Sequence, residues 1–213
     1  MSLLADISEA LHAGDDARVP ELTRKAIAAG MPAQEILDSG LIAGMTVVGR
    51  RFRNYEIFLP DVLLAARAMQ GGVDELRPHF LSGDVPSVGT VVLGTVRGDL
   101  HDIGKNLVAI MLKGAGFRIV DLGKGVAPAR FVDAALEENA SIIGMSALLT
   151  TTAPVMAEVT ALVRERGLSD SIKTIAGGAP MTEALAHELG ADSFAFDAPS
   201  AVDRIKELAG VQP

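Results

Sequence analysis

The sequence predicts a two-domain α/β protein, in which a four-helix bundle precedes a five-stranded parallel sheet covered by helices on both faces. Up to about residue 85 the apolar residues recur at helical spacing, whereas beyond it short apolar runs alternate with helical segments. Strands that alternate with helices are typical of parallel sheets with crossover connections. The composition of Ser82–Ser87 indicates a linker, so we expect domains at 1–87 and 88–213.

Four helices are expected in the N-terminal half. Apolar residues three and four apart mark the first two, which end at Gly14 and Gly30. Pro20 fits the first turn of the second helix, because its missing N–H does no harm there. A third helix is expected from Pro32 to about Phe52 and a fourth from about Phe58 to Phe80. The third contains glycines that lower its helix propensity unless a neighbouring helix or a ligand approaches closely: Gly40, Gly44 and Gly49.

The C-terminal half contains five strand candidates, each followed by a helix. The strands are expected at 90–96, 118–122, 141–146, 174–176 and 193–196. The helices are expected at about 104–114, 128–139, 153–166, 181–189 and 200–209. In folds of this class the ligand lies beyond the carboxyl ends of the strands, so we expect the loops there to carry the function.

The composition excludes several classes of function. The 213 residues include no cysteine, which excludes disulfides, thiolate zinc sites, iron–sulfur clusters and a cysteine nucleophile. Any metal must be held by oxygen or by one of four histidines: His12, His79, His101 and His187. The formal charge of −8 argues against a nucleic-acid partner. Because the chain shows no signal peptide and no apolar run of about 20 residues, we expect a cytoplasmic protein without a membrane partner.

The loop after the first strand, Arg97–Asn106, is the first candidate site, since it is polar and longer than a minimal turn. Asp99 and His101 are two residues apart, so the carboxylate can accept a hydrogen bond from one ring nitrogen while the other nitrogen points outward. Such a carboxylate fixes the tautomer of the ring and makes the free nitrogen a better metal ligand. The alternative is a solvated loop whose histidine only caps the next helix.

Small and hydroxyl-bearing residues follow two other central strands. They are Ser146–Thr152 after the third strand and Ala176–Ala179 after the fourth. Such residues could leave a slot that runs down into the domain, lined by hydroxyls and bare backbone. For Gly177–Gly178, an ordinary strand-to-helix turn is the alternative.

Together these motifs resemble the cobalamin-binding signature of methionine synthase and of the corrinoid proteins of methyltransferase systems. The resemblance is carried by Asp99–Asn106, Ser146–Leu148 and Gly177–Gly178 in the C-terminal half, and by Gly44–Phe52 and Phe58–Met69 in the helical half. It implies a Rossmann or flavodoxin-like cobalamin-binding domain behind an N-terminal helical cap. The chain is most similar to free-standing corrinoid proteins, which carry these two domains and work with separate methyltransferase subunits.

The resemblance implies a cofactor, cobalamin or a related cobamide, bound with its own base off the cobalt and its nucleotide tail in the slot. The cobalt would cycle between a methylated form and Co(I). His101 would be the metal ligand, with Asp99 as its hydrogen-bond partner, and these two residues would carry the catalytic role. Further cofactor contacts are expected from Asp102, Ile103, Gly104, Ser146, Leu148, Thr150, Thr152, Gly177 and Gly178.

Methionine synthase extends this relay to a serine, which aligns with Thr152. Thr150 could substitute for it, and a plain helix N-cap is the alternative role for Thr152.

The helical half would act as a cap in this interpretation. Phe58 and Leu59, with Val62 and Leu63, would lie over the methyl-bearing face of the cofactor and exclude water and oxygen. Plain helix core is the alternative for each of them. Because the methyl donor and acceptor must reach the cobalt, the cap must move, and Ser82–Ser87 is the natural hinge.

The function implied by the resemblance is that of a methyl carrier. The chain would accept a methyl group from a substrate-specific methyltransferase and deliver it to an acceptor methyltransferase that uses tetrahydrofolate, a pterin or a thiol. A reductive activase is a further expected partner, and the chain would be a cofactor-carrying subunit more than an enzyme by itself. The motifs leave open the methyl donor, the lower base of the cobamide and the oligomeric state.

Three alternatives come from other classes. One is a B12-dependent sensor or regulator that acts through a separate partner, and another is the cobalamin-binding part of a carbon-skeleton mutase. The last is a nucleotide-binding flavodoxin-like module, which is disfavoured because the first loop lacks Gly-x-Gly-x-x-Gly.

Overall fold

The computed structural model of the protein describes residues 2–80 and 85–211. The chain forms two compact units, Met1–Ser87 with Gly114–Gly116, and Val88–Lys113 with Phe117–Pro213. Of the expected linker, residues 82–84 lie outside the described residues, while residues 85–87 belong to no helix or strand. Within the described ranges, no helix has both the length and the apolar character that crossing a bilayer requires.

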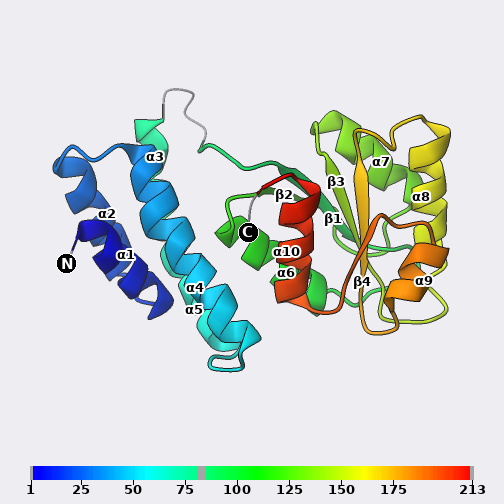
Figure 1. The fold of residues 1–213 in the computed structure, drawn as a ribbon, viewed down its shortest axis with the longest axis horizontal. Helices are drawn as coiled ribbons and strands as arrows, with labels where there is room; N and C mark the ends of the chain where they lie inside the picture. The colour runs from blue at the N-terminus through cyan, green and yellow to red at the C-terminus, as the bar shows by residue number, and fades with distance from the viewer. Residues whose placement is uncertain (1, 81–84, 212–213) are drawn as a thin grey trace. The chain divides into compact units, whose positions relative to one another are not determined.

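The first unit is a helical bundle, as predicted (Figure 1). A side-chain cap opens it, because the hydroxyl of Ser2 accepts a hydrogen bond from the backbone N–H of Ala5. The apolar faces of the helices meet in a core in which Ile7, Leu41 and Leu76 are completely buried. The elements are α1 (Leu3–His12), α2 (Arg18–Ala28), α3 (Ala33–Ile36), the π-helix η1 (Leu37–Ile42), α4 (Ala43–Arg53), α5 (Leu59–Leu76) and the 3-10 helix η2 (Arg77–His79).

The helix predicted from Pro32 to Phe52 runs through α3, η1 and α4, with a change of pitch in the middle. A Cβ atom added at Gly40 would lie 3.3 Å from a methyl carbon of Ile7, and one added at Gly44 would lie 3.2 Å from the Cα atom of Ser8. Both glycines therefore let α1 approach closely, which offsets their low helix propensity.

The fourth predicted helix ends earlier than expected. It was predicted to reach Phe80, but α5 ends at Leu76 and only the 3-10 helix η2 continues it. Pro78 explains the difference, because it has no N–H to donate to the carbonyl of Asp74 and so cannot extend the α-helical ladder.

The second unit contains a five-stranded, entirely parallel sheet in the order β2-β1-β3-β4-β5, which confirms the predicted α/β class. Its strands are β1 (Thr90–Thr95), β2 (Arg118–Asp121), β3 (Ile142–Ser146), β4 (Lys173–Gly177) and β5 (Ser193–Ala195). Its helices are α6 (Ile103–Gly114), α7 (Pro128–Glu137), α8 (Val155–Glu165), α9 (Glu183–Glu188) and α10 (Ala198–Leu208). The loop after β1 and the segment between β3 and α8 both follow central strands of the sheet. The parallel strands therefore bring these two segments to the same carboxyl edge.

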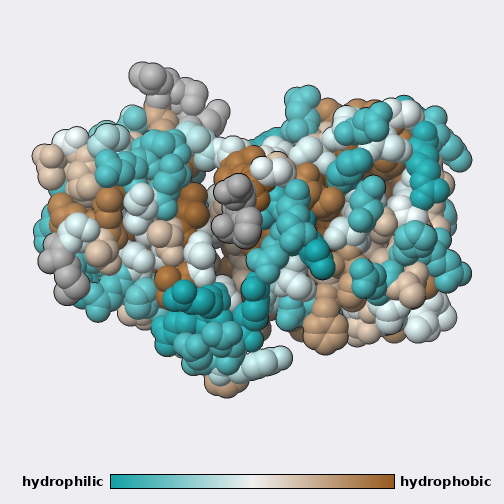
Figure 2. All heavy atoms as spheres, in the orientation of Figure 1, coloured by the Kyte–Doolittle hydropathy of each residue, from teal (hydrophilic) through white to brown (hydrophobic). Residues whose placement is uncertain are grey.

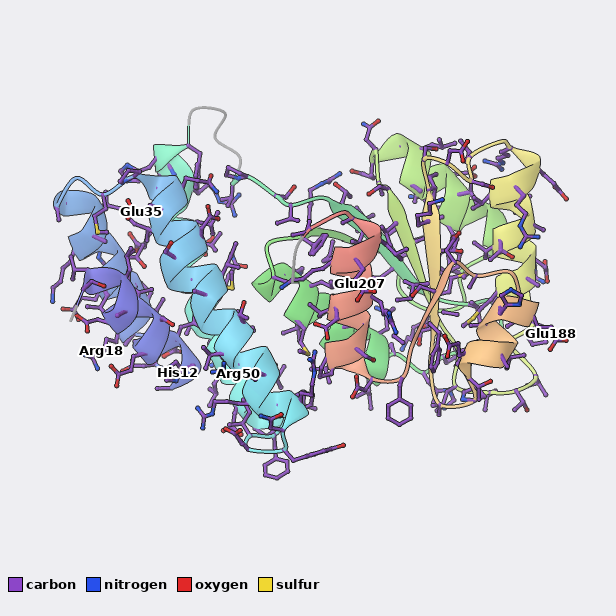
Figure 3. All side chains as sticks on the ribbon, in the orientation of Figure 1. His12, Arg18, Glu35, Arg50, Glu188 and Glu207 are labelled. Carbon is purple, nitrogen blue, oxygen red and sulfur yellow. The ribbon has the colours of Figure 1, made fainter. Side chains whose placement is uncertain are left out.

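Helices cover both faces of the sheet (Figure 1). α7, α8 and α9 pack on one face in an apolar core around Phe131 and Met156, whose side chains are completely buried. α6 and α10 lie on the other face, against the row in which Leu93, Gly144 and Ile175 are paired. The outward side of α10 carries exposed charged residues and is hydrophilic in Figure 2, and Glu207 is labelled on this helix in Figure 3.

Gly94 of β1 provides a test of the packing between the sheet and α7. A Cβ atom added there would lie 2.6 Å from a ring carbon of the buried Phe131, so Gly94→Ala should lower the free energy of unfolding by about 1–3 kcal/mol. Gly89→Ala is the control, since its added carbon would meet Phe117 at an ordinary 3.7 Å. Urea denaturation of both variants measures the effect, and equal stabilities would contradict the prediction.

Candidate functional site

A buried carboxylate organises the carboxyl edge of the sheet. The side chain of Asp99 is completely buried. Its Oδ1 atom accepts hydrogen bonds from the backbone N–H of His101 at 3.0 Å and lies 2.8 Å from the ring Nδ1 of the same residue. Its Oδ2 atom accepts from the backbone N–H groups of Leu148 at 2.8 Å and Leu149 at 3.2 Å, and from the hydroxyl of Thr152 at 2.8 Å. One side chain thus joins the loop after β1 to the loop after β3.

The hydrogen bonds keep Asp99 ionised despite its burial. Burial by itself raises the pKa of Asp99, because it removes water from the charged form. The backbone donors of His101 and Leu148, the Thr152 hydroxyl and the His101 ring lower this pKa more, and the net pKa is well below the usual range. Asp99 is therefore a carboxylate at any ordinary pH.

An ionised Asp99 determines which nitrogen of His101 is available. Since the carboxylate can only accept, Nδ1 carries the proton that it shares with Asp99, and the neutral ring has its lone pair on Nε2. The ring is accessible, because 53% of the His101 side chain is exposed. The buried hydroxyl of Thr95 donates to the backbone carbonyl of His101 at 3.0 Å, which ties this residue to the end of β1.

A second buried charge fixes the first turn of α6. The side chain of Lys105 is 2% exposed, and its ammonium group lies 2.6 Å from both carboxylate oxygens of Asp121 and 2.7 Å from the side-chain oxygen of Asn106. Because Asp121 ends β2, this ion pair ties α6 to the sheet directly after the His101 loop.

A cavity of about 670 Å³ opens at the carboxyl edge and runs down between the sheet and the two helices α6 and α10. His101, Asp102 and Ser146 lie at its mouth, where the strands end. Further down, side chains of the sheet and of the two helices line it: Leu93, Ile175, Leu107, Val108, Ala201 and Ile205.

Glycines shape the cavity at two places. A Cβ atom at Gly144 would overlap the side chain of Leu93, and one at Gly178 would overlap the backbone of Ala147. Gly178 also has a φ of +125°, which a residue with a side chain would rarely adopt.

Most of the predicted site residues line this one cavity. They are His101, Asp102, Ile103, Gly104, Ser146, Leu148, Gly177 and Gly178. Asp99 lies beneath the mouth and acts through His101. Phe58 and Leu59 belong to the first unit, at the start of α5, where 65% of Phe58 and 36% of Leu59 are exposed. Their role as a cap stays a prediction, whereas Val62 belongs to the buried stripe of α5, as the core alternative expects.

The structure distinguishes the two threonines that could extend the Asp99–His101 pair. Thr152 donates its hydroxyl to Asp99, while Thr150 is exposed and is not among the donors to this carboxylate. The N-cap alternative for Thr152 is not observed, because Pro154 occupies the N-cap position of α8.

Several contacts of the site were not predicted from the sequence. They are the bond from Thr95 to His101, the ion pair of Lys105 with Asp121 and the lining residues of α10, which depend on the strand order and on helix packing. Gly144 did have a signal, because a glycine inside an otherwise apolar strand indicates a close approach.

Comparison with known proteins agrees with this geometry. Residues 89–206 and residues 3–77 each match a family model described as a B12 binding domain. The chain belongs to the B12-binding family of corrinoid proteins. Its cofactor is therefore cobalamin or a related cobamide.

Two relatives of this corrinoid protein span most of its length. It is 40% identical to a corrinoid protein of Desulfitobacterium hafniense over 99% of both chains. It is 47% identical to dimethylamine corrinoid protein 1 of Methanosarcina acetivorans over 82% of both chains.

Two solved structures share its fold. A cobalamin-binding protein from Desulfitobacterium hafniense is 33% identical, with a TM-score of 0.80 over 97% of this chain and 98% of that one. The methanol:cobalamin methyltransferase complex MtaBC from Methanosarcina barkeri is 30% identical, with a TM-score of 0.89 over 99% of this chain and 80% of the other.

The residues of the second unit fit a cobamide. Because Gly144 has no Cβ atom to displace the lining residue Leu93, the cavity has room for a bulky group between the sheet and two helices. At its mouth, His101 has an accessible imidazole, and an imidazole nitrogen is a suitable ligand for a transition metal such as cobalt.

The hydrogen bond from Thr152 to Asp99 can be tested with an isosteric variant. Thr152→Val removes a donor from a buried carboxylate and should cost about 1–3 kcal/mol of unfolding free energy at pH 7, measured by urea denaturation. It should also raise the pKa of Asp99, which the carboxyl carbon-13 shift reports in a pH titration. Thr160→Val is the control, since Thr160 is also buried but donates its hydroxyl to the backbone carbonyl of Leu189. An unchanged Asp99 titration in Thr152→Val would contradict the assignment.

The lowered pKa of Asp99 also predicts the direction of acid sensitivity. In the unfolded chain an aspartate has a pKa of about 3.9. Because the folded pKa is lower, the contribution of Asp99 to stability is complete above the unfolded value and is lost as the pH falls through the folded one. Thr152→Val, with its higher folded pKa, should lose a smaller part of its stability on acidification than the wild type. Thr160→Val should follow the wild-type curve at a constant offset.

Proposed function

We propose that the protein is a methyl carrier, which receives a methyl group on the cobalt of its cobamide from a substrate-specific methyltransferase and delivers it to an acceptor methyltransferase. The observation that carries this proposal is the Asp99–His101 pair at the mouth of a deep slot. Relatives named as methylamine corrinoid proteins and the similarity to a methanol:cobalamin methyltransferase complex support the same function. The partners are then the two methyltransferases, with a tetrahydrofolate, pterin or thiol acceptor, and a reductive activase.

His101 is the residue of the chain that would ligate the metal. Asp99 holds Nδ1 at 2.8 Å and keeps the neutral ring in the tautomer that presents Nε2. Because Asp99 stays ionised, a proton taken up by the pair goes to the imidazole and withdraws its lone pair from the metal. The cofactor would supply a cobalt that carries the methyl group. The Asp99–His101 pair would set the strength of the bond between the imidazole and this metal.

The slot would hold the nucleotide tail of the cobamide, with its lower base away from the cobalt. Space for a bicyclic base and its ribose is consistent with a cavity of about 670 Å³. Gly144 leaves the lining residue Leu93 in place, and Ser146 offers a hydroxyl at the slot mouth.

The division of labour between the two halves is part of the proposal. Residues 88–213 would bind the cofactor, and residues 1–87 would cap its reactive face with Phe58 and Leu59, whose exposed side chains suit an apolar cover. Transfer between partners then needs the cap to move about the linker. We place the protein in the cytoplasm, where the methyltransferases of such systems would meet it.

The assignment of His101 is tested by the electron paramagnetic resonance spectrum of the Co(II) protein reconstituted with cobalamin. The wild type should show a nitrogen triplet, which becomes a doublet when the histidines are labelled with nitrogen-15. His101→Ala should lose the labelled signal, because among the described residues of the second unit His101 is the histidine that lines the slot.

The matched control is His187→Ala, which removes a histidine on α9 and should leave the signal intact. A labelled doublet that survives in His101→Ala would show that another residue is the ligand. If the wild-type protein forms no coloured complex with cobalamin, the methyl-carrier proposal is wrong.

The role of the slot is tested by Gly144→Ala. The added methyl group overlaps Leu93 and pushes it into the slot, so the affinity for cobalamin should fall on the order of tenfold. Cobinamide, which lacks the nucleotide tail, should bind this variant as it binds the wild type. Gly89→Ala should change neither affinity, and an equal loss for both ligands would contradict a tail-binding slot.

A further inference from the structure

The slot changes chemical character with depth. The row of the sheet at its mouth pairs Ser146 with Gly177, and the row two residues below pairs Gly144 with Leu93 and Ile175. Two residues along a strand correspond to about 6–7 Å. At this lower level the side chains around the slot are all aliphatic: Leu93, Ile175, Leu107, Val108, Ala201 and Ile205.

The two charged side chains that α6 and α10 contribute to the cavity are held by neighbouring groups, and the other polar side chains that line it, His101, Asp102 and Ser146, lie at its mouth. The ammonium group of Lys105 lines the cavity, but its three donors are directed at the two oxygens of Asp121 and the side-chain oxygen of Asn106. The Asp197 carboxylate, which also lines the cavity, accepts from the backbone N–H of Ser200 and caps α10. The strand backbone is paired in the sheet. Among the described residues, the lower slot therefore offers a ligand no unpaired side-chain donor or acceptor.

From this lining we propose that the protein selects cobamides by their lower base, accepting an apolar benzimidazole and discriminating against a purine such as adenine. The inference rests on the proposed function, and it concerns which cobamide the protein prefers. The sequence motifs left the lower base open.

The physical reason is the cost of polar groups without partners. The methyl groups and the ring of dimethylbenzimidazole can pack against aliphatic side chains, and the slot removes their apolar surface from water. Adenine carries an exocyclic amine and additional ring nitrogens, which are hydrogen-bonded to water in the free cofactor. Leaving such groups unpaired in an apolar cavity weakens binding on the order of tenfold for each group.

Size does not make the distinction. Both bases are bicyclic, and a cavity of about 670 Å³ accommodates either one with its ribose. The selectivity between the two bases must therefore depend on the chemistry of the side chains that line the slot. A hydroxyl group added to this lining should reduce the selectivity.

The experiment measures equilibrium binding of the full-length apoprotein to cobalamin, adeninyl cobamide and cobinamide from their absorbance changes. We expect cobalamin to bind at least about tenfold more tightly than adeninyl cobamide. The near-isosteric Val108→Thr variant should reduce this ratio severalfold, because its hydroxyl oxygen can accept a hydrogen bond from the adenine amine even where the hydroxyl proton is given to the preceding turn. The two bases differ in how readily they leave the cobalt, but this difference is a property of the free cofactors. It therefore cancels when the ratio of the two affinities is compared between variants.

Val163→Thr is the matched control, since it makes the same change on α8, in the core on the other face of the sheet. It should leave the ratio unchanged, and circular dichroism checks that both variants are folded. Equal binding of the two cobamides by the wild type, or a ratio that Val108→Thr does not lower relative to Val163→Thr, would overturn the inference while leaving the methyl carrier intact. Failure of all three corrinoids to bind would instead overturn the proposed function.

Discussion

The site depends on the buried carboxylate of Asp99, which lies between the loops after β1 and β3 and accepts hydrogen bonds from both. A charge removed from water is stable only where donors surround it. Here two oxygens receive bonds from three backbone N–H groups, a threonine hydroxyl and the ring of His101. Because every donor belongs to one of the two loops, the same bonds that stabilise the charge also set the position of the histidine.

The parallel sheet makes this arrangement available. β1 and β3 are neighbours, so the residues that follow them emerge at the same edge although they are about fifty positions apart in the chain. The glycine in β3 and the small residues of α10 then leave room beneath the histidine, between the sheet and its helices. The accessible histidine at the mouth and the deep slot beneath it are thus two results of one topology.

Much of this could be predicted from the sequence, because hydrophobic periodicity determines the elements and alternating strands and helices determine a parallel sheet. The Asp99–His101 pair was predictable from its spacing, and the family resemblance pointed to Thr152 beyond it. Thr95, Lys105 and the lining residues of α10 were not predictable in this way, since their position depends on which strands pair and on how the helices pack. The π-helical turn η1, whose Gly40 lies close to Ile7 of α1, was not predicted from the sequence either.

The hydrogen bonds from the loop after β3 to Asp99 affect how the sequence of this loop can change over evolution. Leu148 and Leu149 hold the carboxylate with their main chain, so any residue except proline at these two positions supplies the same N–H donors. The side chain of Leu149, which is 42% exposed, can therefore vary without loss of this hydrogen bond, whereas that of Leu148 also lines the slot. The surface of the loop at residue 149 can therefore change over evolution while the position of His101 is preserved.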